Sequence, residues 1–329
     1  MNSFEYASPN TLEEATSLLG SHWGETEVLA GGTDLVTSLK QDITRPQRVI
    51  SLKNIKSLQG IAASEKSVRI GATTSLRVLA DHAAIREHFP SLVTATENIG
   101  SAQTIAVGTV AGDLCQRPRC WYFRNGYGLL GTNHGKSLIP GGENRYHAIF
   151  GNDGPAYFVT PSSLGPTLIA LGATINVAGK DGGTRAVSAS QFFRIPKAES
   201  ERETVLKPSE IVTSIDIPIN GLNNAIYEVR HRHGFDWPYV AAAIAFESSD
   251  GKTSNARVVL GHVAPKPWIC SAAENLLNSS IVTESLAEQV GHAATQGAKP
   301  LSGNGYKIQL VKTAVKRAIL IAAGISRKG

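Results

Sequence analysis

The chain has 329 residues, of which 42% are hydrophobic and 18% charged, a composition typical of globular proteins rather than disordered ones. This length predicts two or three domains. The formal net charge of +5 is mild, and no dense run of lysine and arginine is interleaved with aromatic residues, so nucleic acid is not an expected partner. The longest uninterrupted apolar stretch, at 239–246, is far shorter than the roughly 20 residues that span a bilayer, so no membrane span is expected.

The opening residues, "MNSFEYASPNTLEEA", contain no basic segment followed by an apolar one, the pattern of a secretory signal. Three cysteines are too few for the disulfide framework of a secreted protein of this length. We therefore expect a soluble cytoplasmic protein, which reaches the periplasm only if a partner carries it there.

Helical and strand patterns alternate along the first 220 residues. Thr11 and Glu14 have the spacing of a capping box, which predicts that a helix begins at this point. The next pattern, "ETEVLAGGTDL", predicts a strand that enters a glycine turn. The following patterns predict a strand at 67–71, a long helix at 75–88, a helix and a strand at 167–179, and an alternating, half-buried strand at 210–219.

The composition changes near Asn220, where we place a domain boundary. Two strand patterns, "YVAAAIAFE" and "ARVVLGHVA", are followed by helical segments and a terminal amphipathic helix. The spacing of its basic residues predicts that they form the solvent-facing side of this helix: Lys307, Lys312, Lys316 and Arg317. The segment 120–154 is rich in glycine and asparagine and shows no periodicity, and loops of such length are usually functional.

The first candidate site is "VLAGGTDL", which spans 28–35. Glycines let the backbone approach a phosphate closely, and successive amide N–H groups form an anion-binding nest. The segment is neither a Rossmann fingerprint nor a P-loop. A tight turn between a strand and a helix explains the same residues without a ligand.

The second candidate site is "IGSAQTIAVGTVAGDL", which spans 99–114. Its glycines at 100, 108 and 112 alternate with small hydroxyl residues, a pattern that favours close approach of the backbone to an extended polyanion. The alternative is a buried structural loop.

Together these segments resemble the flavin-binding medium subunits of the molybdenum hydroxylases, the group of xanthine dehydrogenase and carbon monoxide dehydrogenase. "AGGTDL" and "TVAGD" match the two FAD motifs, and "FDWPYVAAA" and "VVLGHVAPKPW" resemble the C-terminal domain of such subunits. "RPRCWYFRN" and "GENRYHAIFG" resemble one branch, the flavin subunits of periplasmic aldehyde oxidoreductases.

The resemblance implies an α+β fold. A two-subdomain FAD-binding domain of the PCMH/VAO type would occupy 1–220, with subdomains of about 1–60 and 61–220, and a smaller α+β domain would occupy 221–329. FAD would lie extended, held by main-chain amides where Gly31–Gly32 and Ala111–Gly112 come together. The residues implied at the cofactor are Val28, Leu29, Ala30, Gly31, Gly32, Thr33, Asp34, Leu35, Ile99, Gly100, Ser101, Thr104, Gly108, Thr109, Val110, Ala111, Gly112, Asp113, Ser163 and Val212, the last near the flavin ring.

Two positions bear on the environment of the flavin. The resembled family usually has aspartate at the place of Ser163, so a negative charge beside FAD is missing here. The basic run Arg230, His231, Arg232 and His233 is expected to form a solvated strand edge. The alternative is a role in tuning the flavin ring, because the corresponding segment of the resembled family lies near it. No catalytic residue is assigned.

In the aldehyde oxidoreductase branch, the loop after the second motif holds a four-iron cluster on four cysteines. Cys120 matches the first ligand, but the other three are missing, and Ala156 stands where the last would be. We therefore expect FAD alone and a loop that has lost its cluster. The alternatives are a zinc site on Cys115, Cys120, His134 and His147, or a disulfide between Cys115 and Cys120, which a reducing cytoplasm disfavours.

The implied function is electron transfer. Iron–sulfur centres of a small subunit would pass electrons through FAD to an acceptor such as NAD or oxygen, while a large molybdopterin subunit oxidises the substrate. Two alternatives remain open: a stand-alone FAD-dependent oxidoreductase or oxidase with its own small substrate, and a non-catalytic scaffold that has lost FAD. The substrate, the acceptor and the oligomeric state are not encoded in these patterns.

Overall fold

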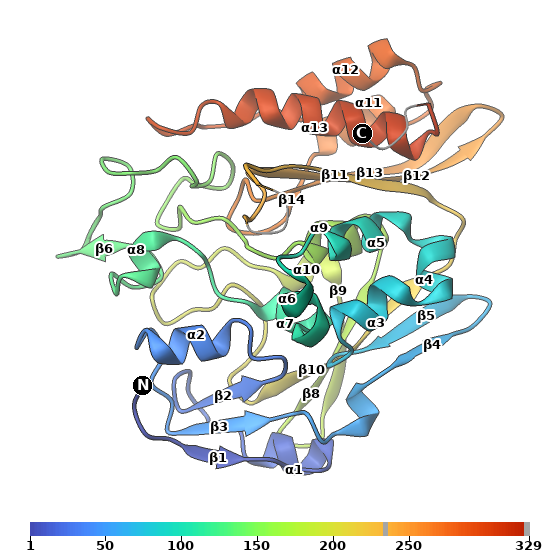
Figure 1. Cartoon of the computed structure of the whole chain (residues 1–329). Coiled ribbons are helices and arrows are strands. Elements are labelled where there is room, and N and C mark those ends of the chain that lie inside the picture. The colour runs from blue at the N-terminus through green and yellow to red at the C-terminus, as the bar shows by residue number, and fades with distance from the viewer. Residues whose placement is uncertain (233–235, 326–329) are drawn as a thin grey trace.

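Three larger β-sheets organise the chain in this computed structural model, which describes residues 1–232 and 236–325 (Figure 1). The first is a three-stranded parallel sheet with the order β1-β3-β2, built from β1 (Glu5–Ala7), β2 (Thr26–Leu29) and β3 (Arg48–Ser51). Helices α1 (Leu12–Ser17) and α2 (Leu35–Lys40) connect it. The predicted helix start is confirmed, because the Thr11 hydroxyl accepts a hydrogen bond from the Glu14 amide.

The second sheet has five antiparallel strands in the order β4-β5-β10-β8-β9. They are β4 (Ile61–Ala63), β5 (Ser67–Gly71), β10 (Glu210–Pro218), β8 (Thr174–Gly179) and β9 (Thr184–Ser188). The predicted alternation along β10 is interrupted by a bulge between Val212 and Ser214. Before the bulge, adjacent residues point to opposite faces: Ile211 packs on the core of the first sheet, whereas Val212 packs on the core of the second.

Short helices cover this second sheet. They are α3 (Leu76–Asp81), α4 (Ala83–His88), α5 (Pro90–Glu97), α6 (Ala102–Val107), α7 (Val110–Cys115), α9 (Leu164–Ala170) and α10 (Ala189–Phe192). The 3-10 turn η1 (Lys56–Leu58) instead contributes Leu58 to the core of the first sheet. The predicted single helix at 75–88 is wrong. His82 has an extended backbone, with ψ of 127°, and divides the segment into α3 and α4.

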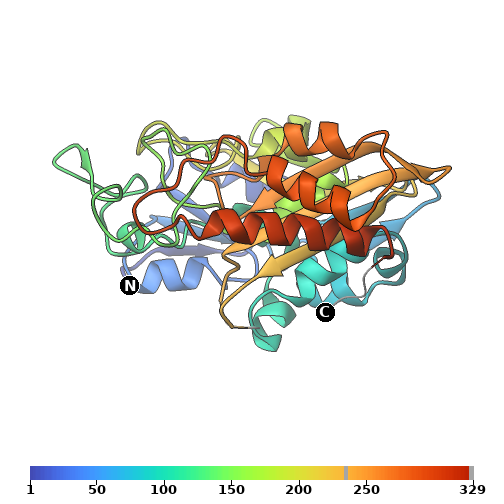
Figure 2. The ribbon, with the colours of Figure 1, turned by 90° about the horizontal axis from the view of Figure 1, so that it is seen from above.

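The third sheet has the antiparallel order β11-β12-β13-β14, from β11 (Asn223–Val229), β12 (Val240–Ser249), β13 (Lys252–Gly261) and β14 (Trp268–Ile269). Helices α11 (Ser271–Leu277), α12 (Glu284–Ala293) and α13 (Lys307–Ala322) cover one face, and α5 and α9 lie on the other (Figures 1 and 2). The sheet is therefore buried on both sides.

The side chains of β12 divide between two cores because successive residues of a strand point to opposite faces. Ala241, Ala243 and Ala245 pack on the core that includes Leu164 and Leu168 of α9. Their neighbours Val240, Ala242, Ile244 and Phe246 pack on the core beneath α11–α13. The segments on either side of residue 220 therefore share one core across α9.

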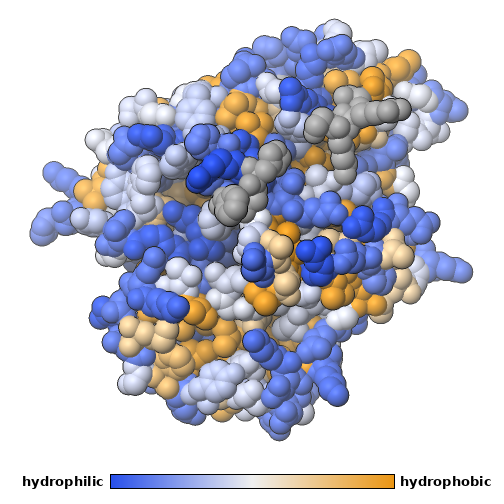
Figure 3. Space-filling model, in the orientation of Figure 1, coloured by the Kyte–Doolittle hydropathy of each residue, from blue (hydrophilic) through white to orange (hydrophobic). Residues whose placement is uncertain are grey.

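The segment 120–154 contains little regular structure, as predicted. It forms only the short helix α8 (Trp121–Arg124) and a hairpin of β6 (Thr132–Asn133) and β7 (Lys136–Ser137). The rest of the segment is held by side chains. No helix in the described part of the chain is both long and apolar enough to cross a membrane. Hydrophilic residues cover most of the face shown in Figure 3, and hydrophobic ones form small patches.

The terminal helix corrects one expectation. Lys316 and Arg317 are on the outer side, but Lys307, at the first position of α13, is 1% exposed. Its ammonium donates hydrogen bonds to the carbonyl oxygens of Tyr146 and His262. Burial lowers the pKa of Lys307 to about 7. The periodicity of the helix could not reveal this, because both partners come from distant segments.

We predict that Ala243→Leu destabilises the protein. The added atoms would enter a filled core between β12 and α9, and overpacking of this kind costs about 1–3 kcal/mol. Urea denaturation measures the free energy of unfolding. Ser248→Leu, on the exposed end of the same strand, is the matched control and should change this free energy by less than about 0.5 kcal/mol.

We also predict a pH dependence of stability from Lys307. Because its pKa is about 10.5 when exposed and about 7 when folded, the unfolded chain binds more protons between these values, and the free energy of unfolding should rise with pH there. The contribution is at most about 1.4 kcal/mol per pH unit. This rise in the free energy of unfolding should be absent in Lys307→Met. The control, Lys312→Met, should keep it. If the free energy of unfolding of wild type and Lys307→Met changes in parallel between pH 7 and 10, Lys307 is not the group responsible.

Candidate functional site

The two glycine turns predicted to bind one ligand lie against each other. A Cβ atom placed on Gly31 would be 2.1 Å from the carbonyl oxygen of Val107 and 3.0 Å from the Cα of Gly108. Only a residue without a side chain fits between these two backbones. The first turn, after β2, is therefore packed directly on the segment that joins α6 to α7.

The first turn presents a row of free amides. Among the described residues, the backbone N–H groups of 31–35 donate no hydrogen bond to the protein. Gly32 has a φ of +80°, a conformation that glycine adopts without strain. Consecutive unpaired N–H groups followed by a helix, here α2, form an anion-binding concavity. This geometry agrees with the predicted role of the segment 28–35.

The second turn differs from the expectation that its amides face the ligand. The amides of Val110 and Ala111 donate to the carbonyls of Thr74 and Ala72. The amide of Gly112 donates to the Thr109 hydroxyl, which caps α7. These amides are therefore used within the protein, and the second turn contributes surface and close approach rather than hydrogen-bond donors.

Three adjoining cavities form one extended groove along the two turns. Their volumes are about 460, 180 and 130 Å³, and Gly112 and Gln116 line all three. The groove is defined here as the union of these cavities. Together they fall in the range of volumes typical of small-molecule and cofactor sites.

Most of the predicted residues line this groove. The largest cavity is lined by Thr33, Asp34, Ile99, Gly100, Ser101, Thr104, Gly108, Thr109, Gly112, Asp113 and Ser163. The two smaller ones add Val28, Ala30, Gly31, Gly32, Leu35, Ala111 and Val212. Leu29 and Val110 line none of them, and Val110 is fully buried in the core under α3 and α9.

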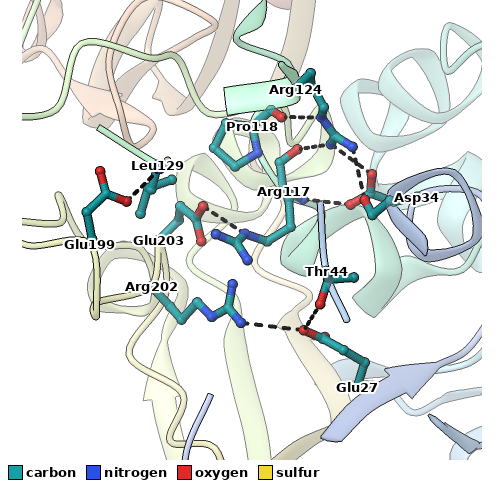
Figure 4. Close-up of polar contacts among 11 residues, drawn as sticks. Glu27, Asp34, Thr44, Arg117, Pro118, Arg124, Leu129, Glu199, Arg202 and Glu203 are labelled. Atoms are coloured by element: carbon teal, nitrogen blue, oxygen red, sulfur yellow. Dashed lines mark hydrogen bonds and ion pairs between the residues drawn. The ribbon is translucent and has the colours of Figure 1, made fainter. Parts of the chain in front are cut away.

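The side chain of Asp34 does not face the groove as a free carboxylate. It accepts hydrogen bonds from the backbone N–H of Arg117, at 2.7 Å, and from the guanidinium of Arg124, at 3.0 Å (Figure 4). It also pairs with Arg119 at 3.0 Å. Asp34 therefore ties the first turn to the arginine-rich loop between α7 and α8.

The same loop is tied to a third segment, 199–203. Arg117 donates to Glu203 at 3.0 Å, and the carboxylate of Glu199 accepts from the amides of Leu129 and Leu130 (Figure 4). Arg202 pairs with Glu27 at 3.4 Å, next to the first turn. The loop that begins at Arg117 is therefore held by ion pairs and hydrogen bonds on both sides.

Asp113 supplies a carboxylate beside Ser163. It is 6% exposed and accepts hydrogen bonds from the Ser162 hydroxyl at 2.6 Å and from the amides of Ser163 and Leu164. It thereby caps the start of α9. Burial raises the pKa of Asp113, and these hydrogen bonds oppose the rise. The carboxyl group of Asp113 thus contacts the backbone of Ser163, the position where the resemblance implies an aspartate.

Arg230 lines the groove and is buried, which corrects the expectation of a solvated strand edge at this residue. Its guanidinium is buried, forms an ion pair with the buried Glu228, and donates a hydrogen bond to the Asn98 carbonyl at 2.6 Å. Glu228 was not found from the sequence. His231 and Arg232 are exposed, and His233 lies outside the described residues. The buried pair fixes the segment 98–100 where it lines the largest cavity.

The cysteines and histidines of the loop do not converge. Cys120 lies beside His147, with Sγ 3.1 Å from Nε2, whereas Cys115 lines the groove and His134 is exposed. All three cysteines of the chain are free thiols. Within residues 1–232 and 236–325, no group of three or more histidine, cysteine, aspartate or glutamate side chains has the geometry to hold a metal ion. The zinc and disulfide alternatives therefore lack support.

We predict that Gly31→Ala lowers the free energy of unfolding by about 1–3 kcal/mol, because its methyl group would force the two turns apart. Gly183→Ala is the control, since its Cβ would meet no atom within 4 Å. It should leave stability unchanged or raise it by up to about 1 kcal/mol. Equal thermal unfolding of the two variants would show that the turns are not in close contact.

Comparison with known proteins identifies flavin-binding subunits as similar along almost the whole chain. The family described as FAD binding domain in molybdopterin dehydrogenase matches residues 2–220, and the CO dehydrogenase flavoprotein C-terminal domain matches residues 225–322. The aldehyde oxidoreductase FAD-binding subunit PaoB of Escherichia coli K12 is 30% identical, over 95% of this chain and 96% of the relative. The carbon monoxide dehydrogenase medium chain of Hydrogenophaga pseudoflava is 26% identical, over 96% of each chain.

Solved structures agree with these relatives. A carbon monoxide dehydrogenase from Hydrogenophaga pseudoflava that lacks the Mo-pyranopterin moiety is similar with a TM-score of 0.77, over 99% of both chains at 25% identity. Quinoline 2-oxidoreductase from Pseudomonas putida 86 has the same fold, with a TM-score of 0.76. The predicted α+β fold is confirmed, and the chain belongs to the family of FAD-binding subunits of the molybdenum-containing hydroxylases and dehydrogenases.

Proposed function

We propose that FAD lies extended along the groove and that the subunit passes electrons through it within a multi-subunit molybdenum hydroxylase. The observation that carries this proposal is the first turn, where five consecutive unpaired amides lie against the backbone of a second glycine turn. Such a nest suits the pyrophosphate of a dinucleotide, which needs donors without bulky side chains. When bound, FAD supplies the redox chemistry.

The residues of this chain would bind and orient the cofactor. The amides of 31–35 would hold the pyrophosphate, and the hydroxyl-rich surface of Ser101, Thr104 and Thr109 would line the path of the ribityl chain. Arg230, fixed by Glu228, adds a buried positive charge to the largest cavity. Val212 lines the cavity of about 180 Å³ beside Ala111, in keeping with an apolar contact to one end of the cofactor.

We propose FAD as the only redox group of this subunit. The surroundings of Cys120 are apolar rather than thiolate-rich: Phe123, Leu129, Leu130, Ala156 and Phe158 form a buried cluster against which Cys120 packs. Ala156, at the place of the last expected cluster ligand, is fully buried in this cluster. Among the described residues, this cluster therefore offers Cys120 as its only thiol to a four-iron cluster.

The relatives support a complex with other subunits. They include a medium chain of carbon monoxide dehydrogenase and FAD-binding subunits of aldehyde oxidoreductase and xanthine dehydrogenase. By analogy, we propose that a large molybdopterin subunit and a small iron–sulfur subunit accompany this chain. Electrons would leave through FAD to a small acceptor such as NAD or oxygen. We place the complex in the cytoplasm, because the three cysteines are free.

The test is purification from the native source, with analysis of flavin, molybdenum and iron in the material that copurifies. We expect a yellow complex with one FAD per copy of this chain and larger and smaller partners that carry molybdenum and iron. A yellow particle containing this chain alone would favour the stand-alone oxidoreductase instead. A colourless protein that does not take up added FAD would leave only the scaffold.

A binding experiment tests the groove itself. Gly31→Ala should raise the Kd for FAD at least about tenfold, equivalent to about 1.4 kcal/mol, because separation of the turns moves the amides away from the pyrophosphate. Quenching of flavin fluorescence on titration measures this Kd. Gly183→Ala, remote from any neighbour, should bind FAD like the wild type. Wild-type affinity in the Gly31 variant would place the cofactor elsewhere.

A further inference from the structure

A second cavity of about 410 Å³, which we call the side cavity, adjoins the groove and is not used by the proposed function. The two share a wall made of Arg119, Asp236, Trp237 and Pro238. In the related aldehyde oxidoreductase branch this region of the chain would carry a metal cluster, whereas here the loop leaves an open space. The side cavity is therefore a separate site with its own chemistry.

Aromatic rings line much of the side cavity. Tyr146 and Tyr239 stack in parallel, with ring centroids 5.6 Å apart and an interplanar angle of 7°. Trp121 meets Tyr146 edge-on at 5.4 Å, and Trp237 lies under the guanidinium of Arg119 at 4.5 Å. Such walls favour a planar ring as ligand, because ring faces and edges attract one another.

The polar end of the side cavity is built around Lys307. The Lys307 ammonium, 1% exposed, donates to the carbonyls of Tyr146 and His262 at 3.0 and 2.9 Å, which leaves its third proton without an acceptor among the described residues. His262 adopts a φ of +62°, a conformation that non-glycine residues seldom adopt, and so brings its carbonyl to Lys307.

Two histidine ring nitrogens at this end of the side cavity also have no hydrogen-bond partner among the described residues. Nε2 of His262 and Nδ1 of His147 are buried and have no hydrogen-bond partner in the part of the chain that the structure describes. Both residues line the side cavity, and both are less than 4% exposed. Buried polar groups in native proteins usually have partners, so unpaired ones at a cavity indicate that a ligand supplies them.

The charge of the side cavity is positive. Its described lining contains Arg119, Arg232 and Lys307 but only one acid, Asp236, which is already paired with Arg232 at 3.1 Å. No carboxylate of the described residues pairs with Lys307. A buried ammonium without a counter-ion is costly, and an anion bound beside it would offset that cost.

We propose that the side cavity binds an aromatic carboxylate, with its ring between the tyrosine and tryptophan side chains and its carboxylate on Lys307. An uncharged planar compound would use the aromatic walls but would leave the ammonium unpaired. A small aliphatic acid would pair with the ammonium but would leave the walls empty. Both the ring and the charge are therefore needed.

The test uses the FAD-loaded protein and benzoate as the probe, with benzamide as its uncharged isostere and acetate as the charge without a ring. Isothermal titration calorimetry at pH 6.5 measures binding, and quenching of tryptophan fluorescence reports on Trp121 and Trp237 in the wall. Benzoate should bind with one site per chain and at least ten times more tightly than benzamide or acetate.

Two variants locate the site. Lys307→Met should weaken benzoate binding at least tenfold, whereas Lys312→Met, on the same helix but outside the side cavity, should bind benzoate like the wild type. Tyr146→Leu, at a partly exposed ring, should weaken binding by a smaller factor and keeps the test decisive if Lys307→Met does not fold. Absence of benzoate binding, equal binding of benzamide, or unchanged affinity in Lys307→Met would overturn the proposal.

Discussion

The contact between the backbone of Gly31 and that of Val107 and Gly108 is the constraint on which the groove depends. It brings the end of β2 to the start of α7, two segments almost eighty residues apart in the chain, without any side chain between them. The consequence is chemical as well as steric. Among the described residues, the amides of 31–35 donate to no acceptor, and the amides of the turn that faces them already have partners. The first turn thus offers hydrogen-bond donors to a ligand, and the second turn offers a surface for the ligand to contact.

The charged groups around the groove act mainly on the protein itself. Asp34 holds the arginine-rich loop, Asp113 caps α9, and Glu228 pairs with Arg230. Asp34 and Asp113 accept hydrogen bonds from groups distant in sequence, whereas Glu228 accepts from Arg230, two residues further along the chain. A hydrogen-bonded or charged partner is the usual condition for burying a charge. This arrangement keeps the groove in shape and reserves the unpaired main-chain donors for an anion.

The C-terminal sheet takes part in the same site. Because β12 packs on α9 through its small alanine side chains, β11 lies close enough for Glu228 and Arg230 to reach the segment 98–100. The loop after β13 supplies His262, and α13 supplies Lys307, to the side cavity that shares a wall with the groove. The second unit of the chain therefore completes both cavities, and a change in its packing on α9 would alter both of them.

Local patterns in the sequence determined much of this structure. The helix start at Thr11 depends on a contact within three residues, and the alternating pattern of β10 and the glycines of the two turns are visible in the spacing of residues along the chain. Tertiary structure alone decided that Lys307 is buried and that His82 divides a helix. It also decided that Val110 lies in the core rather than in the groove, and that Arg230 lines the groove. The positions of Lys307 and Arg230 depend on partners dozens of residues away, such as the carbonyls of Tyr146 and His262 for Lys307 and that of Asn98 for Arg230. Periodicity describes which side of a helix is apolar, but it carries no information about a distant carbonyl that makes a buried charge tolerable.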